Sequence, residues 1–88
     1  MGKVLMKIRV MPTDVNTNLN DIQNEIKKIK LESLEIRDFS IKPIAFGLKS
    51  LIVLAVLPDK EGIGDKLIEE ISKIENVESV EVDEIELL

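Results

Sequence analysis

The sequence predicts an α+β fold with the element order β-α-β-β-α-β, and three observations support this prediction. Seven consecutive apolar residues, 51–57, indicate a strand that is buried on both faces. Other segments show apolar residues at helical or at alternate spacing. The chain also repeats itself with an offset of 46 residues, so that Pro12 matches Pro58 and Ile22 matches Ile68. Two βαβ units joined by a hairpin give the ferredoxin-like arrangement, in which two helices cover one face of a four-stranded antiparallel sheet with the first and third strands central.

The first half of the chain is predicted to form a strand, a helix and a second strand. Residues 3–11 alternate between two faces, which is typical of a strand. Asn18 is a suitable N-cap for a helix with an apolar face. That face consists of Leu19, Ile22, Ile26 and Ile29. Residues 36–44 then return as the second strand, with Phe39 and Ile41 on one face.

The second half is predicted to repeat this order. Residues 48–57 form the third strand, which Pro58 ends. We expect Asp65 to cap or open the second helix and Asn76 to end it. Its core-facing residues are Leu67, Ile68, Ile71 and Ile74. Residues 77–86 alternate again and form the fourth strand.

The composition limits the classes of function that need to be considered. Eighty-eight residues suffice for one domain, so we expect residues 1–88 to form a single domain with an aliphatic core. The chain contains no cysteine and no histidine, which removes thiolate metal sites and the usual general base. It also shows no nucleophile–base pair, so we expect no enzyme. No apolar run is long enough to span a membrane, and we expect a cytoplasmic protein.

Charge is distributed unevenly along the chain. The net charge is +3 over residues 1–58 and −8 over residues 59–88. This acidic balance argues against binding of nucleic acid and is compatible with a basic protein partner or with cations. The acids toward the C-terminus are Glu75, Glu78, Glu81, Asp83, Glu84 and Glu86. They could ligate Mg²⁺ or Ca²⁺, but a charged edge strand that repels other strands is the simpler interpretation.

The turn between the two halves, predicted over residues 43–49, carries an unusual aromatic residue. Phe46 is one of two phenylalanines in the chain, and Gly47 after it permits a positive φ. From residue type alone, Phe46 either folds back over the end of the core or enters a pocket of a partner. Both alternatives remain open at this point.

Two further features receive structural interpretations as readily as functional ones. The segment 62–64, Gly-Ile-Gly, precedes a helix but lacks the third glycine and the Lys-Ser/Thr pair of a phosphate loop. The outward sheet face is expected to be mixed, and either a partner, a second copy or solvent could cover it. Its residues on the first strand are Leu5, Lys7, Arg9 and Met11.

The fold class does not select a function, but the residues exclude several. RNA recognition on a four-stranded sheet would require aromatic residues on the central strands, which are absent here. A metal chaperone would require cysteines, and an acylphosphatase-like site or a small-ligand module would favour a glycine in the loop 13–18. Among the functions known for this fold, binding of another protein is the one that these residues leave open.

The sequence also resembles a known family. The segment 42–51, Lys-Pro-Ile-Ala-Phe-Gly-Leu-Lys-Ser-Leu, followed by segments 57–62 and 67–71, closely resembles archaeal elongation factor 1-beta. That family is similar to the C-terminal exchange domain of eukaryotic elongation factor 1-beta. The resemblance covers essentially the whole chain. It implies a guanine nucleotide exchange factor, with no cofactor and no bound metal, that speeds GDP release from elongation factor 1-alpha so that GTP can enter.

The resemblance also implies which residues bind the partner. In the eukaryotic relatives the aromatic residue of this turn inserts into a pocket of the GTPase near its switch region, and Phe46 matches it. The supporting residues would be Ile44, Ala45, Gly47 and Leu48. The eukaryotic relatives also place a penultimate lysine near the Mg²⁺ site of the GTPase, whereas Leu87 occupies that position here, so this role is not transferred. The density of acidic residues toward the C-terminus suggests a hypothesis in which a terminal acidic side chain competes for the Mg²⁺ ion.

One alternative function belongs to a different class. A small-molecule-sensing module of ferredoxin-like fold would dimerise through its sheet and would be stabilised by its ligand. The exchange factor, by contrast, is expected to be a monomer that binds the GTPase.

Overall fold

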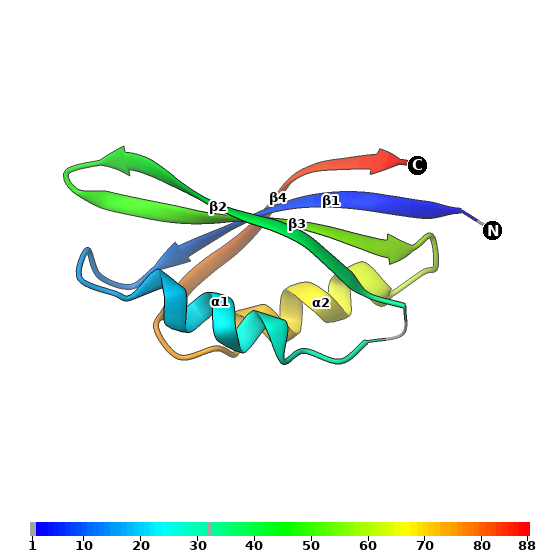
Figure 1. The fold of residues 1–88 in the computed structure, drawn as a ribbon, viewed down its shortest axis with the longest axis horizontal. Helices are drawn as coiled ribbons and strands as arrows, with labels where there is room; N and C mark the ends of the chain where they lie inside the picture. The colour runs from blue at the N-terminus through cyan, green and yellow to red at the C-terminus, as the bar shows by residue number, and fades with distance from the viewer. Residues whose placement is uncertain (1, 32) are drawn as a thin grey trace.

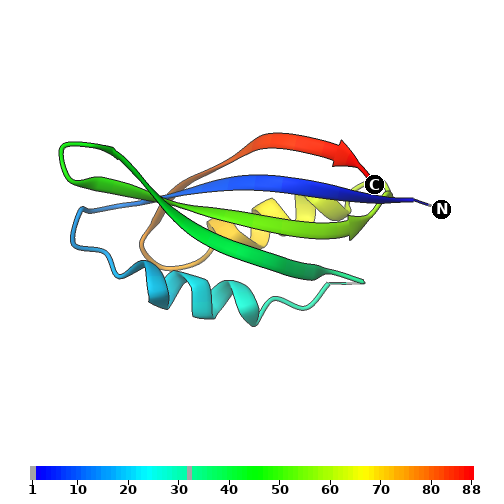
Figure 2. The same ribbon diagram turned by 45° about the horizontal axis from the view of Figure 1, so that its top comes forward.

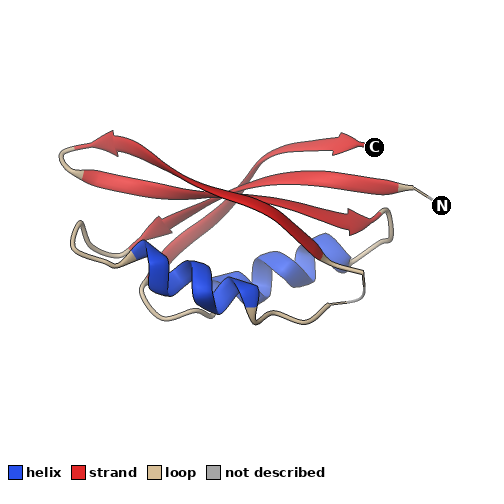
Figure 3. Ribbon diagram, in the orientation of Figure 1, coloured by secondary structure: helices blue, strands red, loops and turns tan. Residues whose placement is uncertain are grey.

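The computed structural model describes residues 2–31 and 33–88, and its six elements follow the predicted order (Figure 1). They are β1 (Lys3–Pro12), α1 (Leu19–Lys27), β2 (Glu35–Ala45), β3 (Leu48–Pro58), α2 (Ile63–Ser72) and β4 (Val77–Leu87). The four strands form one twisted sheet, and both helices lie on the same face of it (Figure 3). The predicted ferredoxin-like arrangement is confirmed.

The strand order in the sheet is β2-β3-β1-β4, and all neighbours are antiparallel. β1 and β3 are therefore central, as predicted. β3 is buried on both faces. One face lies under the helices, and the open face is also shielded from solvent. Its buried residues on the helix side are Leu51, Val53, Ala55 and Leu57, and those on the open side are Ser50, Ile52 and Val56.

The core lies between the helices and the sheet. α1 contributes Leu19, Ile22 and Ile26, and its N-cap forms as predicted, since the Asn18 side chain accepts a hydrogen bond of 2.9 Å from the backbone N–H of Asn20. α2 contributes Leu67 and Ile71, which correspond to Ile22 and Ile26 at an offset of 45 rather than 46 residues. The offset between the two helices is therefore one residue shorter than the offset between the strands. The strands keep the offset of 46 residues, because β1 ends at Pro12 and β3 ends at Pro58.

Both ends of α2 differ from the sequence prediction. The helix begins at Ile63, two residues before Asp65, because Gly62 adopts a φ of +88° and turns the chain into the first helical turn. Asp65 still lies in the first turn, where its charge favours the helix dipole. The helix ends at Ser72, and Asn76 instead has a φ of +71° in the turn that leads to β4.

β4 is an edge strand with two different faces. Val80 and Val82 lie opposite Val10 and Ile8 of β1. Val80 packs against the core, whereas Val82 is exposed. A register shift between Lys7 and Ile8 marks an irregularity in the β1–β4 ladder.

Among the described residues, no helix is long and apolar enough to cross a membrane.

Candidate functional site

The β2–β3 hairpin extends beyond the rest of the sheet. β1 pairs with β3 only as far as Val10, which lies opposite Leu51, whereas β2 and β3 continue to pair until Ala45 faces Leu48. The final three residues of this ribbon therefore have no third strand beside them, a length of about 10 Å. Figures 1 and 2 show the tip of the hairpin at one end of the long axis of the molecule.

The hairpin closes with a two-residue turn, Phe46-Gly47, which is shorter than the turn predicted over residues 43–49. Phe46 has a φ of +53° and Gly47 a φ of +79°. Positive φ at both central positions is characteristic of the type I′ turn, because its twist matches that of the flanking strands. The strands can therefore pair almost to the tip. Glycine accepts this conformation freely, but a residue with a Cβ pays roughly 1–2 kcal/mol.

The side chain of Phe46 is completely exposed, with a relative accessible area of 101%. It therefore does not fold back over the core, which was one of the two alternatives open from the sequence. The other aromatic residue behaves differently. Phe39 is half-buried on the helix side of β2 and packs against the core, with the Lys27 ammonium 5.7 Å from the centre of its ring.

The predicted supporting residues lie beside Phe46 at the tip. Ile44 is exposed at a register shift of the β2–β3 ladder, where a bulge turns the end of the strand. Ala45 and Gly47 are also exposed, and Leu48 is half-buried. The structure thus gathers all five predicted partner-binding residues on one short ribbon.

A buried serine secures the root of the ribbon, and sequence reasoning did not single it out. Ser50 is almost fully buried, and its hydroxyl donates a hydrogen bond of 3.2 Å to the carbonyl oxygen of Lys42 on the opposite strand. The hydroxyl group is thereby satisfied although it is shielded from water. This cross-strand bond adds to the ladder at the point where support from β1 ends.

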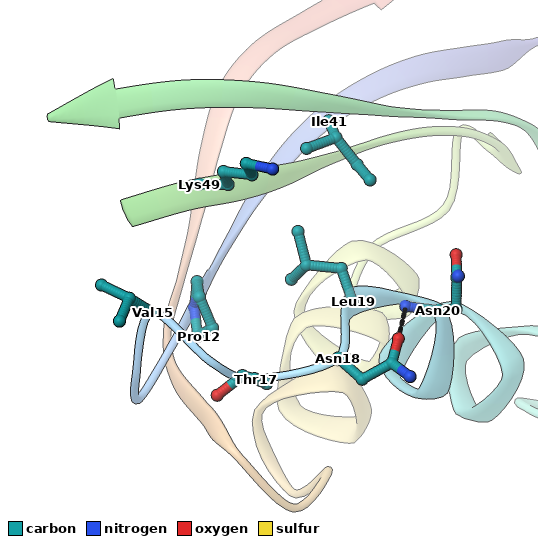
Figure 4. A pocket seen from close by; sticks show the side chains of 8 residues that line it. All are labelled: Pro12, Val15, Thr17, Asn18, Leu19, Asn20, Ile41 and Lys49. Carbon is teal, nitrogen blue, oxygen red and sulfur yellow. Dashed lines mark hydrogen bonds between the residues drawn. The ribbon is translucent and has the colours of Figure 1, made fainter. Parts of the chain in front are cut away.

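A shallow cavity of about 200 Å³ lies under the helix side of the hairpin (Figure 4). It is lined by Pro12, Val15, Thr17, Asn18, Leu19, Asn20, Ile41 and Lys49. We call it the notch. It lies between the β1–α1 loop and the base of the hairpin. The sequence analysis did not identify it.

The acidic face of β4 is partly neutralised within the protein. The Arg9 guanidinium donates a hydrogen bond to the Glu81 carboxylate and lies 3.6 Å from Asp83. The hydrogen bond to Glu81 and the charge of Asp83 raise the pKa of Arg9. Across the described part of the chain, no group of three or more acidic side chains is arranged to hold a metal ion. β4 lies at the edge of the sheet and carries these charges.

The glycines before and within α2 have structural roles. Gly62 adopts a positive φ, and a Cβ at Gly64 would lie 3.3 Å from the sulfur atom of Met6. The glycine at position 64 therefore allows the helix to approach β1 closely. Both roles are those of a loop that leads into a helix.

Comparisons with known proteins show the family to which the chain is similar. The family described as EF-1 guanine nucleotide exchange domain matches residues 5–88. Elongation factor 1-beta of Archaeoglobus fulgidus is 61% identical over 88 residues, which cover all of both chains. The protein of the same name from Pyrococcus horikoshii is 39% identical over 79 residues, or 89% of this chain and 87% of that one.

The fold and these matches define a guanine nucleotide exchange domain. The chain belongs to the elongation factor 1-beta family, as its resemblance had indicated. These family matches confirm the predicted function, guanine nucleotide exchange for elongation factor 1-alpha in translation elongation. The alternative of a small-molecule-sensing module is not favoured.

Solved structures of similar shape confirm the fold and carry no further conclusion, because their sequences are distant. The ACT domain from GTP pyrophosphokinase of Chlorobium tepidum superposes with a TM-score of 0.69 at 21% identity, covering 91% of this chain and 85% of that one. The C-terminal domain of the MgtC protein from Mycobacterium tuberculosis gives 0.63 at 13% identity, covering 99% and 89%.

Proposed function

We propose that the β2–β3 hairpin is the surface through which this chain binds elongation factor 1-alpha, with Phe46 as the anchor. The observation that carries this proposal is the conformation of Phe46, which is fully exposed at a φ of +53°. The fold gains nothing from the ring at this position and bears the cost of the left-handed backbone. Strained residues of this kind are typically kept where a function requires them.

The energetics of the anchor are favourable. A phenylalanine side chain that becomes fully buried in a pocket contributes about 1.5–3 kcal/mol before the costs of association. The two-residue turn and the bond from Ser50 hold the hairpin in shape, so that little further ordering is required on binding. Ile44, Ala45, Gly47 and Leu48 adjoin Phe46 at the tip and would line the edge of the contact.

Nucleotide exchange follows from binding alone. A factor that binds the nucleotide-free GTPase about 1000-fold more tightly than the GDP form weakens GDP binding by the same factor, or about 4 kcal/mol. No covalent bond is made or broken, so the chain acts as a binding protein rather than an enzyme and needs no cofactor. Since Leu87 replaces the lysine of the eukaryotic relatives, the proposed action is on the conformation of the GTPase.

Further parts of the proposal concern the protein as a whole. Residues 1–88 would act as one exchange domain and as a monomer, in the cytoplasm where translation elongation takes place. The net charge of −5 supports a protein partner over a nucleic acid or an anionic membrane.

The test is the release of a fluorescent GDP analogue from the cognate elongation factor 1-alpha. The native chain should accelerate release, and Phe46→Ala should lose at least about tenfold of that acceleration, as expected for a central aromatic anchor. Phe39→Leu serves as the control, because it alters the other aromatic residue and leaves the hairpin tip intact. Full acceleration by a folded Phe46→Ala protein would show that the anchor is elsewhere.

A further inference from the structure

Phe46 alone exposes too little surface to hold a protein partner. Its ring can bury about 200 Å², whereas a specific interface usually buries about 800 Å² on each partner. A partner that receives Phe46 must therefore also cover a flank of the hairpin. Which flank is covered follows from the chemistry of the two sides, given the proposed function of the hairpin tip.

The two flanks of the hairpin differ in chemistry. The open side presents Ser40 and Lys42, which lie opposite Ile52 and Ser50 and are exposed and polar. The helix side presents Ile41, which is 47% exposed although it lies opposite the buried Leu51. Apart from the tip residues already described, the exposed apolar side chain of β2 that a partner could cover, Ile41, therefore lies on the helix side.

The notch continues this apolar surface onto the body of the protein. Val15, in the β1–α1 loop, is 54% exposed, and Pro12 and Leu19 form the buried floor beneath it. Figure 4 shows these side chains opposite Ile41 and Lys49 of the hairpin. Exposed apolar residues in contact with a hollow are typical of a surface that binds another protein.

The size and charge of the notch indicate what it accepts. Its volume of about 200 Å³ is below the roughly 300 Å³ at which small-molecule pockets begin, so a single side chain fits better than a metabolite. Among its eight lining residues Lys49 alone is charged, and its ammonium group favours a carboxylate nearby. A second copy that met this rim across a two-fold axis would bring the same lysine toward it, and the two charges would repel each other.

We infer that the notch is a second docking site for the same GTPase. It receives an apolar side chain of the GTPase, beside which a carboxylate faces Lys49. Phe46 lies in the turn at the tip of the hairpin and Lys49 is the second residue of β3, so both contacts lie at the same end of the molecule and within one ordinary interface. A second contact beside the first also fixes how the hairpin is rotated within the pocket that receives Phe46.

The experiment measures the affinity of the factor for nucleotide-free elongation factor 1-alpha by calorimetry. Val15→Asp should weaken binding about tenfold or more, because it places an acid where an apolar side chain docks. Asn24→Asp is the matched control, since it adds the same charge on an exposed part of α1 outside the notch, and it should bind like the native chain.

Lys49 is tested separately through the rate of association. Lys49→Glu should slow association several-fold at low salt, and the difference should shrink at high salt. Lys30→Glu is the control, because Lys30 is exposed beyond α1 and remote from the notch in sequence, and it should change the rate much less.

The outcomes separate this inference from the proposed function. If Phe46→Ala weakens binding while Val15→Asp binds like the native chain, the notch is not a docking site and the hairpin anchor stands. If neither variant weakens binding, both proposals fall. Methyl NMR of the complex gives an independent readout, because the signal of Ile41 should shift on saturation with the GTPase, and an unchanged signal would overturn the inference.

Discussion

Replacing Phe46 with asparagine should stabilise the fold while it removes the exchange activity. Phe46 makes no packing contribution that the substitution could remove, since its side chain is fully exposed. It does bear the cost of a φ of +53°, roughly 1–2 kcal/mol, whereas asparagine tolerates this region and Asn-Gly is a preferred pair in type I′ turns. We expect a gain of about 0.5–1 kcal/mol, which for a domain of this size raises the Tm by roughly 2–8 °C.

The assay is urea unfolding followed by circular dichroism, because the chain contains no tryptophan or tyrosine to report by fluorescence. Phe46→Ala is the reference variant. It keeps a Cβ in the left-handed conformation, so its stability should match that of the native chain. A loss of more than about 1 kcal/mol in either variant would refute the reasoning, because it would show that the ring of Phe46 packs against the fold.

Three further predictions concern the stability of the fold. Gly47→Ala should cost about 1 kcal/mol in urea unfolding from backbone strain alone, since a Cβ there would meet no atom within 4 Å; no change would argue against the positive φ. Leu67→Ala should cost about 2–5 kcal/mol, whereas Ile85→Ala, at a position 61% exposed, should stay within about 0.5 kcal/mol; equal losses would contradict the assigned core. The hydrogen bond to Glu70 raises the pKa of Lys73 above 10.5, so this stabilising contribution is complete below that value and lost as the pH rises through the raised pKa. The difference in stability between the native chain and Lys73→Met should therefore stay constant between about pH 6 and pH 9, and a drift within this range would contradict the assignment.

The elements that sequence analysis predicted best are those specified by local pattern. The apolar run 51–57 indicated a central strand, and the structure buries it on both faces. The predicted start of α2 was wrong by two residues, because Asp65 and Gly62 are both compatible with a helix start and the φ of Gly62 decided between them. Such a choice depends on how the preceding loop packs and not on the residue types alone.

The exposure of Phe46 and the notch could not be predicted from local pattern. Whether Phe46 touches the core depends on how far β1 extends beside β3, and the register of those strands is a property of the whole sheet. The notch brings Val15 and Ile41 together from segments that share no motif. The resemblance to the family identified the hairpin residues, while the structure alone showed which flank of the hairpin is apolar.

The most direct test of the hairpin anchor uses fluorine NMR on the chain labelled with fluorophenylalanine. Only two residues take up the label, the half-buried Phe39 and the exposed Phe46, so Phe39 provides an internal reference. On saturation with nucleotide-free elongation factor 1-alpha, the signal of Phe46 should move away from its solvent-exposed position, while that of Phe39 should change much less. A Phe46 signal that keeps its solvent-exposed position in the saturated complex would contradict insertion of the ring into the GTPase.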